Sequence, residues 1–202
     1  MVDLPFTEAN LRPHGDTLLR VARRALVYSV GQREVMPLEH GDWPLVLGAA
    51  GTSFVTLTCG GDLRGCIGSL QPRGPLLNDI VRNTYSAACH DPRFAPVEPD
   101  ELGAICLDIS VLMPPEALEA ADERSLLNQL RPGVDGLVLE AGPRRATFLP
   151  SVWSSLPEPQ DFLDHLRLKA GLPRDFWGQE LRFSRYKALI FKESDASGVK
   201  TP

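Results

Sequence analysis

The sequence lacks the features that mark a membrane protein or a secreted one. No apolar run approaches about 20 residues, the length that a helix needs to span a bilayer. Residues 1–8 do not have the charged-then-apolar layout of a signal peptide. We therefore expect the chain to be cytosolic.

Several motifs of well-defined chemistry are also missing. The chain has no phosphate loop of the type G-x-x-x-x-G-K-[ST], no H-E-x-x-H and no C-x-x-x-C-x-x-C cluster motif. Its four cysteines show neither C-x-x-C spacing nor a nearby pair of histidines, which argues against a tetrahedral zinc site. We expect the chain itself to carry no metal or cofactor and its thiols to be reduced.

The chain has no excess of positive charge. Its 202 residues carry a formal net charge of −5, and 43% of them are hydrophobic. An acidic balance argues against nonspecific nucleic-acid binding, whose affinity depends on neutralising phosphates. The length fits one domain or two small, closely packed ones, and it is sufficient to bury a substantial core.

The most informative stretch is LRGCIG, residues 63–68, which we call the signature. It follows a β-branched and aromatic run and a Gly-Gly-Asp turn, a pattern typical of a β-hairpin. Simple alternation places Arg64 and Cys66 on the same face of the second strand. Glycine weakens a strand, so the two glycines of the signature indicate a β-bulge, or the close approach of a ligand or of another backbone.

The rest of the chain alternates between helix and strand patterns. Helical spacing of apolar residues occurs over residues 16–31, 75–90 and 160–170. Strand patterns occur in a run from 45 into the first hairpin, over 105–112, in a second hairpin at 137–149 and in one final strand at 181–192. Hairpin, proline-marked break and helix therefore occur twice along the chain.

The domain organisation follows from these patterns. Residues 1–13 are expected to be a lead-in without periodicity, and residues 194–202 a disordered tail by composition. Residues 14–193 then form a single domain.

The signature resembles the hallmark hexapeptide of the AMMECR domain family, the A component of the so-called AmmeMemoRadiSam system. The similarity extends over residues 14–192 and includes the stretches 75–94, 132–139, 145–153, 162–166 and 169–173. This resemblance implies an α+β fold, mainly antiparallel sheets with amphipathic helices. Two related β-plus-helix halves would exchange strands and form a larger and a smaller lobe around a cleft. It also implies two partners, a Memo-like protein and a radical S-adenosylmethionine (SAM) protein, in a modification or metabolic pathway.

One hypothesis makes Cys66 the nucleophile of a thiol-dependent transfer or hydrolysis. Its thiolate would need stabilisation, which Arg64 and the N-terminus of the helix beginning near Pro75 could supply. A base would come from one of the four histidines, His14, His40, His90 and His165. Of these, His90 follows the next helix and His40 precedes the hairpin, and these two positions suit the role best.

A second hypothesis, which we favour, makes the signature a binding surface. Gly65 and Gly68 would let a small anionic ligand or a peptide lie against the strand, with guanidinium contacts from the arginines Arg64, Arg73 and Arg93. A partner protein could also dock there, by pairing with the strand edge.

A third interpretation is structural. The two glycines would permit close packing of a helix, and Cys66 would be a small buried hydrophobe. The stretch Asp91-Pro92-Arg93-Phe94 is then a helix stop, in which Arg93 pairs with Asp91 or caps carbonyl groups and Phe94 fills the core.

Overall fold

The computed structural model describes residues 6–38 and 43–193, which form two compact units. Unit 1 extends to Leu112 and resumes at Leu189, and unit 2 is Met113–Ala188. Three sequence predictions lie outside the described residues: His40 as a base, the start of the lead-in and the tail at 194–202.

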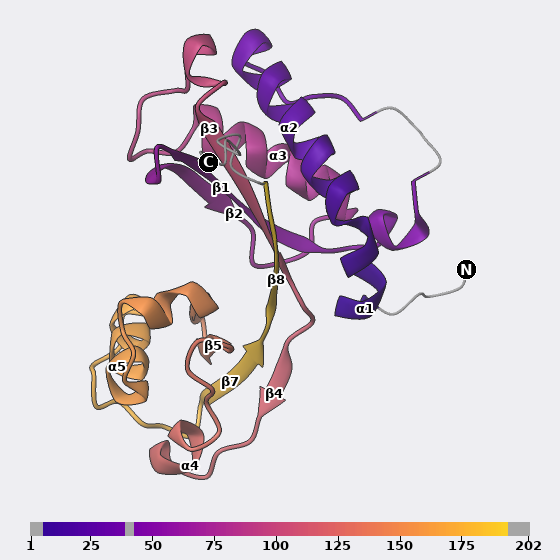
Figure 1. Ribbon diagram of the computed structural model, residues 1–202. Helices are drawn as coiled ribbons and strands as arrows, with labels where there is room; N and C mark the ends of the chain where they lie inside the picture. Colours follow the sequence, from indigo (N-terminus) through magenta and orange to yellow (C-terminus); the bar gives the residue numbers. More distant parts are fainter. Residues whose placement is uncertain (1–5, 39–42, 194–202) are drawn as a thin grey trace, which may run out of the picture. The chain divides into compact units, whose positions relative to one another are not determined.

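Unit 1 is a four-stranded antiparallel sheet with two long helices on one face (Figure 1). The strand order is β2-β1-β3-β8, with bounds β1 Thr52–Cys59, β2 Asp62–Gly68, β3 Ile105–Leu112 and β8 Ala188–Lys192. The helices are α1 Glu8–Leu11, α2 Gly15–Gln32 and α3 Leu76–Cys89, with 3₁₀ turns η1 Arg12–His14, η2 Leu45–Gly48 and η3 Pro99–Glu101. The helix α1 and the fully buried Leu11 lie in the stretch expected to be a lead-in.

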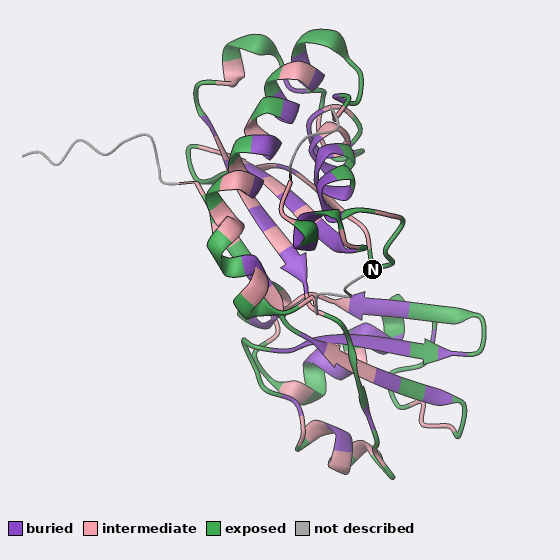
Figure 2. Cartoon of the chain, turned by 90° about the vertical axis from the view of Figure 1, so that its right-hand side faces the viewer, coloured by how far each residue is buried: buried purple, intermediate pink, exposed green. Residues whose placement is uncertain are grey.

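The period-two pattern decides which face of the sheet the helices cover. Along β1, Val55 and Leu57 are fully buried, while Thr56 and Thr58 are only half-buried. The same alternation runs along β3, where Leu107 and Ile109 are buried. Figure 2 shows this alternation of burial along the strands. One face therefore carries the core, and the other carries polar side chains.

The first hairpin forms as predicted. Gly60 and Gly61 have φ angles of 60° and 91°, the left-handed values that a two-residue hairpin turn requires. Cys59 pairs with Asp62 and Cys66 pairs with Thr56, so the two cysteines are not opposite each other. All four cysteines are free.

Two boundaries in unit 1 differ from the prediction. The helix α2 does not end at Gly31 but continues to Gln32, and Arg33 closes it with φ 57°. Leu45–Gly48 is a 3₁₀ turn rather than the start of a strand. In both places the local sequence allows two conformations, and tertiary packing selects one of them.

Unit 2 is a second four-stranded antiparallel sheet, of order β4-β7-β5-β6. Its elements are β4 Glu116–Leu118, α4 Glu123–Leu127, β5 Gly136–Ala141, β6 Arg144–Phe148, η4 Pro150–Ser154, α5 Pro159–Lys169 and β7 Leu181–Tyr186. Trp153 stacks on the fully buried Phe162 of α5, with ring centroids 3.8 Å apart. The second hairpin and its helix thus repeat the plan of β1, β2 and α3.

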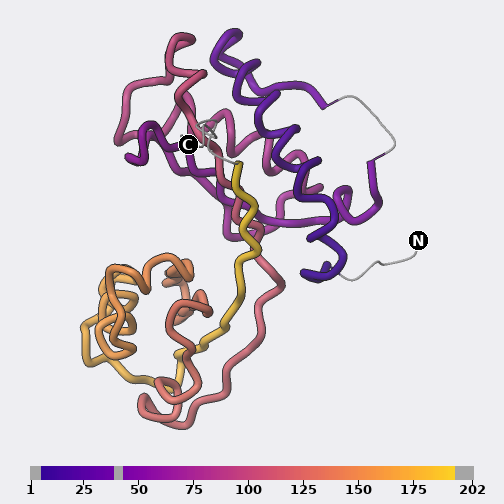
Figure 3. Tube along the Cα trace, in the orientation of Figure 1, coloured from indigo at the N-terminus to yellow at the C-terminus, as the bar shows by residue number. Residues whose placement is uncertain are grey.

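The predicted final strand at 181–192 is two strands in two sheets. β7 pairs with β4 and β5 in unit 2, whereas β8 lies beside β3 in unit 1. The chain passes between the units twice, near residues 113 and 187, where Met113 N–H donates to the Lys187 carbonyl at 2.8 Å (Figure 3). The α+β class and the exchange of strands between two halves are confirmed. Among the described helices, none has both the length and the apolar character to cross a membrane.

Candidate functional site

The signature strand β2 is an edge strand, and a β-bulge interrupts its pairing with β1. Leu57 pairs with Gly65 and Thr58 pairs with Leu63, so Arg64 is the extra residue. A bulge was one of the three explanations that the glycines suggested, and it reverses part of the predicted alternation. Leu63 lies opposite Thr58, on the face that also carries Cys66.

The bulge gives Arg64 a different role from the predicted one. Its Nε and Nη2 donate to the two carboxylate oxygens of Glu101 at 2.7 and 2.9 Å, and its Nη1 donates to the Ala95 carbonyl at 2.8 Å. The Glu101 carboxylate raises the pKa of Arg64, and Arg64 in turn lowers the pKa of Glu101. Arg64 therefore fastens the loop after α3 to the sheet edge, and the expected pairing of Arg64 with Cys66 is not formed.

Two side chains from that same loop hold the backbone of Cys66. The Cys66 N–H donates to Asp91 Oδ2 at 2.8 Å, and Arg93 Nη2 donates to the Cys66 carbonyl at 3.1 Å. Arg93 also makes a two-pronged contact with Asp91, at 2.9 Å through Nε and 2.7 Å through Nη2. We call Asp91 and Arg93 the clasp. Side chains here do what a neighbouring strand would do, which closes this edge to strand pairing at Cys66.

The clasp is strongly polarised. The Asp91 side chain is 1% exposed, and the hydrogen bonds from Arg93, followed by that from the Cys66 N–H, hold its pKa well below its usual range. The pKa of Arg93 is raised, chiefly by Asp91 and to a smaller extent by the Cys66 thiol. The guanidinium beside Cys66 is thus Arg93, and its side chain is 51% exposed.

Cys66 itself is half-buried. Thr56 Oγ1 donates to its Sγ at 3.3 Å from the neighbouring strand. The pairing continues across the polar face, since Thr56 lies opposite Asp108 of β3, and Asp108 binds Lys192 of β8 at 3.1 Å. A polar row of these side chains therefore crosses the face of the sheet that the helices leave uncovered.

The two glycines are explained by packing within the chain. A Cβ at Gly65 would overlap the Ala87 carbonyl oxygen of α3, and a Cβ at Gly68 would overlap the Phe54 ring. Their predicted contact with a ligand stays a prediction. Arg73, another predicted ligand contact, is exposed in the loop that follows β2.

The orientation of α3 is opposite to what thiolate activation would need. Its last turn lies over the signature, because the Ala87 carbonyl meets Gly65, so the negative end of the helix dipole is the nearer one. At the other end of α3, Asp79 accepts hydrogen bonds from Ser53 Oγ at 2.7 Å and Ser69 Oγ at 2.6 Å. Asp79 and Asn83 are buried, although the sequence pattern places them on the surface.

The described histidines do not reach Cys66 by a hydrogen bond. His90 Nε2 lies 2.7 Å from Tyr85 Oη, and the two rings meet edge to face. His14 precedes α2, and His165 is an exposed residue of α5 in unit 2. A base for Cys66 is therefore not assembled within residues 6–38 and 43–193.

Sequence reasoning identified the Asp91–Arg93 pair but missed Thr56, Asp108 and Glu101. The turn and the glycines pointed toward the correct register, since a bulge at position 64 moves Thr56 from Gly65 to Cys66. Phe94, expected to fill the core, is only half-buried with Arg93 over its ring, and Val97 is the buried residue of this loop.

Comparisons with known proteins agree with this architecture. A sequence model of the AMMECR1 family matches residues 19–191. A protein of Methanothermobacter thermautotrophicus is 40% identical over 184 residues, covering 90% of this chain and 95% of its own length. Protein MJ0810 of Methanocaldococcus jannaschii is 35% identical over 193 residues, covering 91% and 92%. The crystal structure of the uncharacterized protein PH0010 from Pyrococcus horikoshii matches with a TM-score of 0.81 and 32% identity, covering 91% and 93% of the two chains. These matches confirm the resemblance seen in the sequence: the chain belongs to the AMMECR1 family.

Proposed function

We propose that this chain is a binding component that presents Cys66 and Arg93 to a small anionic ligand or to a partner protein. One observation supports this most directly: a half-exposed guanidinium lies beside a half-buried thiol on an edge whose backbone is already satisfied. Arg93 Nη1 makes no recorded hydrogen bond within the described residues, so it has donors to offer to a carboxylate or phosphate. The resemblance to the family supplies the partners, a Memo-like protein and a radical SAM protein.

An enzyme that uses Cys66 as its nucleophile is the second candidate. Arg93 favours it, because a neighbouring cation stabilises a thiolate. The orientation of α3 and the separate pairing of His90 with Tyr85 count against it. Binding is therefore the function that the geometry supports better.

Co-purification tests the binding proposal. The chain would be produced together with the Memo-like and radical SAM proteins of its own organism and purified through a tag. Arg93→Ala is expected to reduce recovery of a partner at least severalfold, while Arg24→Ala, an exposed arginine on α2, leaves it unchanged. Equal recovery with both variants, with both folded by circular dichroism, would refute a role for Arg93 in partner binding.

A further inference from the structure

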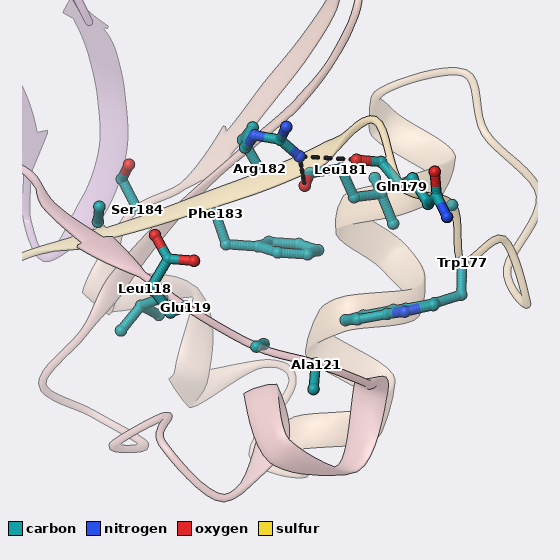
Figure 4. Close-up of a pocket in the computed structure, with 12 residues that line it drawn as sticks. Leu118, Glu119, Ala121, Trp177, Gln179, Leu181, Arg182, Phe183 and Ser184 are labelled. Carbon is teal, nitrogen blue, oxygen red and sulfur yellow. Dashed lines mark hydrogen bonds between the residues drawn. The ribbon is translucent and has the colours of Figure 1, made fainter.

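Unit 2 contains a pocket of about 860 Å³, which lies between residues 117–121 and 177–184 (Figure 4). This volume lies within the usual range for pockets that hold small molecules. The pocket forms where the ladder between β4 and β7 ends. Leu118 is the last residue of β4 to pair, opposite Phe183, and the chain then turns away while β7 extends back to Leu181.

Two aromatic rings form one wall of this pocket. Trp177 and Phe183 have ring centroids 5.7 Å apart and planes within 18° of each other. Figure 4 shows both rings extending into the space between the two chain segments, with Ala121 on the opposite side. Since Ala120 and Ala121 have small side chains, they leave room for a planar group to lie against the rings.

The Trp177 wall is held in place by a buried arginine. Arg167 of α5 is 0% exposed, and its guanidinium lies 5.8 Å from the centre of the Trp177 ring. It donates to Glu123 at 2.7 Å, to Asp164 at 3.2 Å and to the Arg174 carbonyl at 2.6 Å. These contacts join α4, α5 and the segment leading to Trp177. The pocket is therefore preformed, which reduces the entropic cost of binding.

The rim of the pocket carries one charge of each sign. Glu119 follows the last paired residue of β4, and Arg182 precedes Phe183 on β7. Arg182 Nη1 donates to the Leu181 carbonyl at 2.9 Å and to the Gln179 carbonyl at 2.7 Å, which orients the guanidinium and leaves Nη2 without a recorded bond in the described part of the chain. No ion pair between Glu119 and Arg182 is recorded there.

The backbone at this opening excludes an added β-strand. The Leu181 N–H donates to the Gly178 carbonyl at 3.0 Å, and the Leu181 carbonyl accepts from Arg182. A peptide strand needs these groups for its own hydrogen bonds. The occupant is thus a compact molecule recognised by its ring and by its charged ends.

We propose that this pocket binds a free aromatic α-amino acid. The ring would stack on Trp177 and Phe183, the carboxylate would bind Arg182 and the ammonium group would bind Glu119. Each part of the ligand has one complementary group in the pocket. This site lies wholly in unit 2 and is independent of Cys66.

Calorimetric titration of the full chain tests this assignment, with L-tryptophan as the probe. Three analogues each lack one recognised group: tryptamine lacks the carboxylate, indole-3-propionate lacks the ammonium group and L-leucine lacks the aromatic ring. Each analogue is expected to bind about tenfold more weakly than L-tryptophan or worse, since one hydrogen bond to a charged group, or one ring contact, is lost.

Variants assign each contact to its residue. Arg182→Gln should remove the preference for L-tryptophan over tryptamine, and Glu119→Gln the preference over indole-3-propionate. Arg124→Gln, an exposed arginine on α4, and Cys66→Ser should leave the affinity unchanged. The assignment is overturned if L-tryptophan gives no heat at millimolar concentration. Equal binding of all four compounds, or an unchanged tryptophan affinity in Arg182→Gln, also overturns it.

Discussion

At the scale of single residues, Gly65 is the position with the least tolerance. A side chain there would meet the backbone of α3 at Ala87, which cannot move without shifting the helix. Gly65→Ala is expected to lower the free energy of unfolding by about 1–3 kcal/mol, the usual cost of overpacking. Gly31→Ala is the matched control, because no atom lies within 4 Å of its Cβ position in α2. It should be neutral or stabilise by up to about 1 kcal/mol. Urea unfolding of both variants measures this difference, and equal effects would contradict it.

Asp91 should make stability depend on acid pH. Its pKa is lowered in the folded chain, so its contribution to stability is fully present above the unfolded pKa of about 4 and is lost as the pH falls below that value. At neutral pH, Asp91→Asn is expected to cost about 1–3 kcal/mol, because bonds to a charged acceptor are weakened. The gap between wild type and variant should then narrow below pH 4. Chemical unfolding at a series of pH values would show it, and a constant gap would argue that the charge of Asp91 is irrelevant.

At the scale of elements, one buried carboxylate fastens α3 to the sheet. Asp79 accepts from the Ser53 N–H and hydroxyl, from Ser69 and from Asn83, at 2.6–2.9 Å. Asp79→Ala leaves these buried donors unpaired and is expected to destabilise the chain by about 3 kcal/mol. Asp175→Ala, at an exposed turn, should change stability by less than about 0.5 kcal/mol. Thermal unfolding of the two variants tests the comparison. Similar melting temperatures would rule out this anchor.

The elements also show what the sequence can and cannot predict. Apolar periodicity correctly predicted α2, α3, α5, β3 and both hairpins, since each depends on a local pattern of burial. Two glycines at a turn predicted its left-handed backbone. The bulge at Arg64, the burial of Asp79 and the pairing of Arg64 with Glu101 were not predictable, because each depends on a partner distant in sequence. A three-residue strand such as β4 gives too short a pattern to detect.

At the scale of the whole molecule, the chain leaves unit 1 and returns to it. Periodicity alone gave one strand at residues 181–192, because Lys187 does not interrupt the alternation, although the sheets on its two sides differ. The site shows the same limit. Sequence identified Cys66, Asp91 and Arg93, but only the fold shows that Arg93, rather than Arg64, lies beside the thiol.

The two units should respond separately to cavities. Leu189→Ala removes a buried side chain from β8 in unit 1, and Leu163→Ala removes one from α5 in unit 2. Each is expected to cost about 2–5 kcal/mol. Hydrogen exchange should then accelerate in β1 and β3 for Leu189→Ala, and in β5 and β6 for Leu163→Ala, because compact units open separately. Faster exchange throughout the chain in both variants would instead indicate one cooperative unit.

The most direct test of the account is the alkylation rate of Cys66 in the native chain, measured residue by residue with mass spectrometry at neutral pH. The account places an accessible thiol beside the Arg93 guanidinium. It therefore predicts that Cys66 is labelled without unfolding, and that Arg93→Ala slows this labelling severalfold, while Arg24→Ala does not. Protection of Cys66 until the chain is unfolded, or an equal rate in Arg93→Ala, would contradict the central claim.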